Sequence, residues 1–253
     1  MLIATWNVNS VAARLPRLLP WLEERAPDVV ALQETKCSRE AFPAADVKAL
    51  GYESLAVGDG RWNGVALLSR VGLEPVAEDL PGHPEPRYVA ARCGGLTATS
   101  VYVPNGRSLD DPHYLYKLDW LRALRETLDD HDPGEPMVIM GDFNVAPTDA
   151  DVWDASAFSG STHVTPAERS AVQALVDWGL TDLPARPGKG DRAFTYWDYR
   201  AGMFHKDLGM RIDLVLASRS VRPLDAYVDR EARKGTGPSD HAPVLVEADL
   251  AAG

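Results

Sequence analysis

Apolar runs alternate with polar segments along this chain, and three of the runs end on side chains that bind metals or phosphates. Short, continuous apolar runs of this kind predict buried strands. Their terminal polar groups are Asn7 after residues 2–6, Glu34 after residues 29–33, and Asp142 with Asn144 after residues 136–140. Carboxylate and amide oxygens suit hard cations, so the pattern places candidate chemistry at strand ends.

The remaining hydrophobic pattern predicts three long helices and further strands. Leucines recur at helical spacing between residues 15 and 22, and Pro27 and Gly179 provide stop signals after the first and third helices. The predicted helices cover residues 11–25, 113–128 and 166–178, and the further predicted strands cover residues 52–57, 64–69, 88–92, 96–103, 212–217 and 242–247.

The order of these elements predicts the fold class. Several strands in the middle of the chain follow one another without helices, which excludes a simple parallel doubly wound sheet. The order instead predicts an α/β (α+β) fold in which two packed mixed sheets carry helices on their outer faces. We expect a single domain over residues 1–253, because no linker, repeat or low-complexity tract interrupts the pattern. Strand ends should then converge on one rim of the sandwich.

The strand-end carboxylates suit a divalent cation. Magnesium prefers oxygen ligands in octahedral geometry and commonly takes one or two carboxylates. A lone Glu after a strand is more often a solvated loop residue, but Asn7 ends one strand and Asp240 precedes another. We therefore predict Glu34 as the principal Mg²⁺ ligand, with Asn7 and Asp240 in or near its shell and Mn²⁺ as an alternative ion.

Asp142 and Asn144 are separated by one residue. In an extended segment, residues i and i+2 face the same side, so both polar groups should point into one pocket. Asp142 would then orient or deprotonate water, and Asn144 would donate its amide to a phosphate. A simple Gly-Asp turn is the alternative interpretation.

Asp213 interrupts an apolar strand, where a buried carboxylate is costly unless it is paired. We expect His241 to pair with it, because an Asp–His pair fixes the imidazole tautomer and leaves the other ring nitrogen facing substrate. A structural histidine is the alternative, and the sequence leaves open whether Asp142 or His241 is the general base. Tyr102 is either a core aromatic or a phosphate ligand. Arg107 in the following turn is a candidate contact for a nucleic-acid backbone or groove.

Composition restricts the partners and the compartment. The formal net charge of −11 argues against a general polyanion-binding surface, although a metal-dependent nuclease gathers carboxylates for its cation. The two cysteines, Cys37 and Cys93, are too few for a disulfide framework, and no segment has the pattern of a secretion signal or a membrane span. We therefore expect a soluble cytoplasmic monomer.

Seven segments share their order and residue types with one known family, namely TWNVN at 5–9, LQETK at 32–36, GVALLS at 64–69, VYVPN at 101–105, GDFNVAPT at 141–148, RID at 211–213 and SDHAP at 239–243. Together they resemble the exonuclease III family of apurinic/apyrimidinic endonucleases, within the endonuclease, exonuclease and phosphatase superfamily. The resemblance covers nearly the whole chain. It implies functional roles for Asn7, Glu34, Tyr102, Asp142, Asn144, Asp213, Asp240 and His241.

The resemblance also implies a fold, a cofactor and a reaction. The fold is a four-layer α/β sandwich of the DNase I-like type, and the cofactor is magnesium. The reaction is hydrolysis of the DNA phosphodiester 5′ to an abasic site in a duplex, which leaves a 3′-hydroxyl. Members of the family often also degrade duplex DNA from 3′ to 5′ and remove 3′ blocking groups.

The segment 194–200, followed by Met210 and Ile212, looks like the family's site for an extruded abasic sugar. An apolar pocket that fits a deoxyribose would accept a flipped nucleotide without its base and exclude an intact one. Tyr196, Met210 and Ile212 are the predicted walls of this pocket, although each of them taken singly is as consistent with an ordinary core residue.

Three other functions stay open at this level. Some phosphodiesterases of the superfamily act on inositol phosphates or sphingomyelin, but no lipid-facing apolar insertion is apparent in this chain. A nonspecific nuclease of the DNase I type would cut intact duplex as readily as abasic duplex. A noncatalytic DNA-binding protein on the same fold would leave the filled chemical positions without a purpose, and the acidic net charge suits nonspecific DNA binding poorly.

Overall fold

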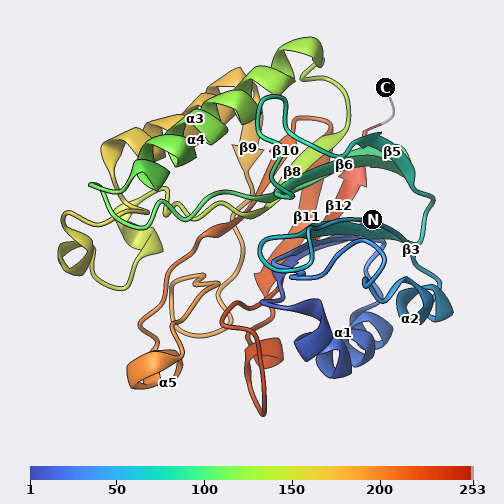
Figure 1. Cartoon of the computed structure of the whole chain (residues 1–253), viewed down its shortest axis with the longest axis horizontal. Helices are drawn as coiled ribbons and strands as arrows, with labels where there is room; N and C mark the ends of the chain where they lie inside the picture. The colour runs from blue at the N-terminus through green and yellow to red at the C-terminus, as the bar shows by residue number, and fades with distance from the viewer. Residues whose placement is uncertain (252–253) are drawn as a thin grey trace.

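The computed structural model describes residues 1–251 and contains two six-stranded sheets (Figure 1). The first sheet contains, in spatial order, β11 (Val221–Val228), β12 (Val244–Leu250), β1 (Leu2–Asn7), β2 (Val29–Gln33), β4 (Val65–Ser69) and β3 (Glu53–Val57). The second contains β5 (Glu74–Ala77), β6 (Tyr88–Cys93), β7 (Leu96–Tyr102), β8 (Met137–Asp142), β10 (Asp213–Ser218) and β9 (Leu180–Asp182).

Helices connect and cover these strands. The α-helices are α1 (Val11–Arg25), α2 (Ala44–Ala49), α3 (Pro112–Glu126), α4 (Pro166–Trp178) and α5 (Met203–Lys206). Short 3₁₀ helices cover Thr127–Asp130, Asp149–Asp151, Ala155–Phe158, Arg200–Gly202 and Arg230–Arg233. No helix within residues 1–251 combines the length and apolar character needed to cross a lipid bilayer.

Three hydrophobic clusters fill the interfaces of a four-layer sandwich. The inner faces of the two sheets meet through residues such as Val29 and Val89. Leu18 of α1 packs on the outer face of the first sheet, and Trp120 of α3 with Leu175 of α4 packs on the outer face of the second. Figure 1 shows α1 and α2 on one side of the molecule and α3 and α4 on the other. Strands covered on both faces read as continuous apolar runs, which is the pattern seen in the sequence.

The strand directions bring polar strand ends to one rim. β1 runs parallel to β2, and β7 runs parallel to β8, so each pair ends at the same edge of its sheet. β12 is antiparallel to β1 and β10 is antiparallel to β8, so these two strands begin where the others end. Residues that follow β2 and β8 therefore lie near residues that precede β12.

The predicted fold class is confirmed, and the differences lie at element ends and sheet edges. The second predicted helix, 113–128, is α3, which ends at Glu126 and continues as a 3₁₀ helix, and the last strand, predicted from residue 242, begins at Val244. The sequence patterns missed α2, α5, β5, β9 and β11. These elements are short or lie at sheet edges, and β11 contains Pro223 and a register shift, so their apolar signal is weak.

Candidate active site

Strand register places three polar residues in one row across the second sheet. Tyr102 of β7 pairs in register with Asp142 of β8, and Asp142 pairs in register with Asp213 of β10. In the facing sheet, Asn7 ends β1 beside Gln33, the last residue of β2, so Glu34 follows at the same edge. Both sheets therefore contribute polar side chains to a single rim.

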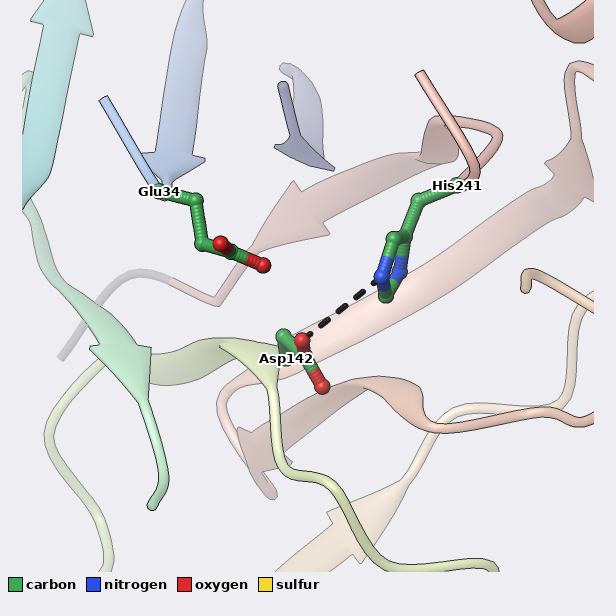
Figure 2. Close-up of side chains that lie close together, drawn as sticks. All are labelled: Glu34, Asp142 and His241. Carbon is green, nitrogen blue, oxygen red and sulfur yellow. Dashed lines mark ion pairs between the residues drawn. The ribbon is translucent and has the colours of Figure 1, made fainter. Parts of the chain in front are cut away.

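Glu34, Asp142 and His241 form a compact cluster at this rim. Their ligand atoms all lie within 4.8 Å of one another, and Figure 2 shows the three side chains pointing toward a common centre. Asn7 joins the two carboxylates, because its Nδ2 donates to Glu34 Oε1 at 2.8 Å and to Asp142 Oδ2 at 2.9 Å. The Oδ1 atom of Asn7 accepts from the Asn9 backbone N–H at 3.0 Å, so the amide nitrogen faces the cluster.

His241 lies between two buried carboxylates. Its Nδ1 is 2.8 Å from Asp213 Oδ2, and its Nε2 is 3.8 Å from Asp142 Oδ2. Burial alone would lower the pKa of His241, but the charges of Asp213 and Asp142 outweigh it and raise this pKa to about 10. The imidazole is therefore a cation at neutral pH, held in one orientation by Asp213.

The predicted proximity of Asp142 and Asn144 is present, but the extended backbone expected for them is not. Asn144 has a φ of 50°, and its backbone N–H donates to Asp142 Oδ1 at 2.9 Å, so the segment forms a tight turn. Gly141 permits this path, because a Cβ there would lie 2.0 Å from the Val101 carbonyl oxygen. Glu34 also has a φ of 50°, a costly conformation for a non-glycine residue that commonly marks functional sites.

A pocket of about 220 Å³ opens over the cluster. It is lined by Glu34, Tyr102, Asn105, Asp142, Asn144, His163, Tyr196, Met210, Ile212, Asp240 and His241. The Tyr196 ring lies 4.9 Å from the His241 ring between centroids, and Tyr196 forms isolated β-bridges with both Met210 and His241. The aromatic and aliphatic side chains thus flank the reactive groups directly.

A profile of the "Endonuclease/Exonuclease/phosphatase family" matches residues 4–241, which include strands of both sheets and the whole cluster. The chain belongs to this family. Exodeoxyribonuclease III of Haemophilus influenzae is 32% identical over 98% of this chain and 99% of its own length.

Solved structures of similar proteins show which members of the family this chain resembles. An AP endonuclease from Archaeoglobus fulgidus superposes with a TM-score of 0.94 at 34% identity, covering 99% of this chain and 100% of the other. The 3′ phosphatase NExo from Neisseria, solved with a product DNA hairpin, superposes with a TM-score of 0.91 at 38% identity and the same coverage. The protein is therefore an exonuclease III-type DNA repair nuclease with the DNase I-like fold.

The donor set of the nuclease fits a hard cation. Glu34 and Asp142 supply carboxylate oxygens on one side of the pocket, and burial, aided by the charges of Asp213 and Glu34, raises the pKa of Asp142 to about 7 against the opposing pull of His241. Two carboxylates this close favour a bound divalent ion, since the ion relieves their repulsion. Nuclease chemistry in this family depends on a metal, and this cluster is the candidate site for it.

Two of the predicted residues lie away from the cluster centre. Arg107 lies outside the pocket, is largely exposed and pairs with Asp111 at 3.6 Å, and it lines a separate hollow with Trp62 and Arg87. Asp240 lines the pocket, but its Oδ1 accepts from Asn9 Nδ2 at 3.0 Å and it is not among the three clustered ligand groups.

Three residues near the site were not predicted. Lys36 pairs with Glu34 Oε2 at 2.9 Å, and this cation with the Asn7 amide outweighs burial and lowers the pKa of Glu34. Asn105 and His163 line the pocket beside Asn144. Lys36 and Asn105 fall inside the quoted motifs, where position next to a strand end could have signalled them. His163 lies in an irregular segment before α4 and carries no such signal.

Proposed function

We propose that this nuclease hydrolyses the phosphodiester 5′ to abasic sites in duplex DNA, leaving a 3′-hydroxyl, and that it also trims nucleotides and blocking groups from 3′ ends. The observation that supports this proposal best is the convergence of Glu34, Asp142 and His241 on one pocket. Tyr196, Met210 and Ile212 form the neighbouring wall of that pocket. A bare sugar fits such a wall, whereas a base attached to it needs more room.

The protein groups of the pocket have complementary roles in the proposed reaction. Asp142 orients and deprotonates the attacking water, because Asn7 and the Asn144 N–H fix the direction of its carboxylate. His241 is the donor rather than the base, because its Nδ1 is engaged by Asp213 and its ring lies between two carboxylates. Its Nε2–H is then available to a phosphate oxygen.

Tyr102 and Asn144 complete the set of phosphate donors. Burial, with the charges of Glu34 and Asp142, raises the pKa of Tyr102 well above its usual value, so the phenol keeps its proton for donation. Asn144 Nδ2 donates one hydrogen to the Val103 carbonyl at 2.9 Å and has a second hydrogen for substrate. Mg²⁺ held by Glu34 beside Asp142 would supply positive charge against the charge that develops on the phosphate.

The decisive experiment uses a duplex with one tetrahydrofuran abasic analogue, incubated with Mg²⁺ or with EDTA, and maps the cut. A single Mg²⁺-dependent incision on the 5′ side of the analogue supports the proposal. A duplex with a 3′-phosphate tests end processing separately, because the two structural relatives carry different activities in their names. Equal cutting of intact and abasic duplex would indicate a nonspecific nuclease, and phosphate release from inositol phosphates would indicate a different phosphohydrolase.

We also infer the compartment and the oligomeric state in which the enzyme acts. Both cysteines are buried and unpaired, as expected for a protein of a reducing compartment, and we infer a cytoplasmic enzyme. We further infer a single domain, because both sheets contribute side chains to one pocket, and a monomer, because one chain supplies every residue that lines that pocket. Light scattering at micromolar concentration tests the monomer, since a mass near twice 27.6 kDa would contradict it.

A further inference from the structure

A buried ion pair lies directly behind the pocket. Lys117 of α3 and Glu168 of α4 both have side chains with 0% exposure, and Lys117 Nζ is 2.5 Å from Glu168 Oε1. Removing two such charges from water costs several kcal/mol per ion by general estimates, and the pair rarely repays this cost as stability alone. Because an apolar pair of similar volume is often at least as stable, stability alone does not account for these charges.

Lys117 holds two loops that line the pocket. Its Nζ donates to the Asn144 carbonyl at 2.6 Å and to the Asn105 carbonyl at 3.3 Å. Gly106 lies tightly against the same side chain, because a Cβ there would be 3.1 Å from Lys117 Cδ and 2.9 Å from Thr162 Oγ1. The ammonium group therefore holds the backbone at Asn105 and at Asn144, the two residues whose side-chain amides line the pocket.

Glu168 extends this network to a third loop. Its Oε1 also accepts from Thr162 Oγ1 at 2.6 Å and from the His163 backbone N–H at 2.9 Å. Its Oε2 accepts from the backbone N–H of Thr165 at 3.0 Å and so completes the capping box that begins α4. One carboxylate thus caps a helix and orients the loop that carries His163.

The side chains at the pocket surface depend on these anchors. Asn144 Oδ1 is 3.2 Å from Asn105 Nδ2 and 3.1 Å from His163 Nε2. Because both contacts reach the same acceptor, the Asn144 amide keeps its nitrogen toward Val103 and substrate. All three of these residues line the pocket, whereas Lys117 and Glu168 do not.

We propose that Lys117, balanced by Glu168, is a positioning residue for the nuclease reaction: it holds the backbone at Asn105 and Asn144, and the Asn105 amide in turn orients the Asn144 amide toward the substrate phosphate. The inference rests on the proposed function only in that the Asn144 amide meets a DNA phosphate. A displacement of about 1 Å in such a group can cost about 10²-fold in rate. The loss should fall on kcat, since the Asn144 amide is aligned for the transition state.

The test separates positioning from stability. Lys117→Met leaves Glu168 buried without its cation and should unfold at a lower temperature than wild type. The double variant Lys117→Met with Glu168→Gln removes both charges and should regain most of the thermal midpoint. We expect the double variant to keep KM within about 3-fold and to lose kcat by roughly 30- to 100-fold on both the abasic duplex and the 3′-phosphate duplex.

Arg25→Met is the control for loss of a cation from an ion pair, because Arg25 pairs with the buried Asp229 at 2.9 Å, its own side chain is 31% exposed, and neither residue lines the pocket. It should lower the thermal midpoint and keep wild-type kcat. A wild-type kcat in the double variant would overturn the inference, as would a loss of kcat in Arg25→Met equal to that in the double variant. If wild type cuts only the abasic duplex or only the 3′-phosphate duplex, the proposed function is limited to that one activity. The kcat values of the variants are then compared on the substrate that wild type cuts.

Discussion

At the residue scale, Asp142 and Asp213 have different surroundings, so replacing each of them should lower activity in a different way. Asp142 faces the pocket and the other ligand groups, whereas Asp213 is bonded to His241 behind it. Both are at most 2% exposed. The difference between them allows the proposed base and the proposed orienting residue to be tested separately.

Asp142→Asn removes the proposed base and one carboxylate of the metal cluster. We expect the single-turnover rate on abasic duplex to fall by about 10²- to 10⁴-fold or more, because proton transfer and charge stabilisation are lost together. DNA binding measured in EDTA should be retained. Near-normal turnover of this variant would remove Asp142 from the role of base.

Asp213→Asn keeps the size of the side chain but withdraws the charge that holds His241 as a cation. Loss of such an orienting partner typically costs about 10- to 100-fold in activity. We expect kcat to fall within that range, with the drop becoming larger as pH rises, because the imidazole then loses its proton more readily. Asp229→Asn is the control, since Asp229 is also buried and paired but lies away from the pocket. An equal loss in both variants would contradict an orienting role.

At the element scale, the start of α4 links stability to pH. Burial and the nearby Lys117 cation lower the pKa of His163 to about 3. The unfolded chain binds a proton at this residue below about pH 6.5, while the folded chain does not, so stability falls as pH drops from 6.5 toward 3. Glu168 makes stability depend on pH in a second, lower pH range. Attraction to Lys117 overcomes the effect of burial and lowers the pKa of Glu168 to about 2, so its contribution is lost as pH falls from 4.5 through 2.

His163→Gln removes the loss of stability between pH 6.5 and pH 3 that His163 causes, and it keeps a hydrogen-bond donor near Asn144. We expect its thermal midpoint to fall less than that of wild type between pH 7 and pH 5, a difference worth about 1 to 2 kcal/mol at the acid end. Thermal melts in matched low-salt buffers measure this difference. Parallel pH curves for the two proteins would show that His163 accepts its proton freely in the folded state.

At the scale of the whole molecule, the metal should contribute to stability as well as to catalysis. The net charge is −11, and Lys36, Asn7 and His241 only partly offset the charges of the Glu34 and Asp142 carboxylates in the pocket. A ligand at about 100 times its Kd stabilises by about 2.7 kcal/mol, which raises the midpoint by several degrees in a chain of this size.

We therefore expect Mg²⁺ to raise the thermal midpoint of wild type, EDTA to reverse the rise, and Glu34→Gln to reduce it. Glu24→Gln is the control, because Glu24 is exposed and distant from the pocket lining. The same titration with Mn²⁺ tests the alternative ion. An unchanged shift in Glu34→Gln would argue that the cation binds elsewhere.

Much of the fold could be predicted from the sequence, because strands buried on both faces need continuous apolar runs and helices need a repeating apolar face. The elements near the middle of each sheet followed from that requirement. Apolar spacing does not describe the whole buried face of α3, because that face includes Lys117 with Trp120 and Leu121, while Leu118 is only half-buried. A lysine at a core position contradicts the apolar pattern, so periodicity alone assigns it to the surface.

The sequence by itself determined which residues end or precede the apolar strands, and with them the chemistry available to Asn7, Glu34, Asp142 and His241. Local pattern carries that information, because a strand's burial depends on its own residues. Only the tertiary structure decided which groups meet, including Lys117 with Glu168, Lys36 with Glu34, and His163 with the pocket. These contacts depend on how the two sheets and their loops stack, and a polar residue in a loop carries no periodic signal of its partner.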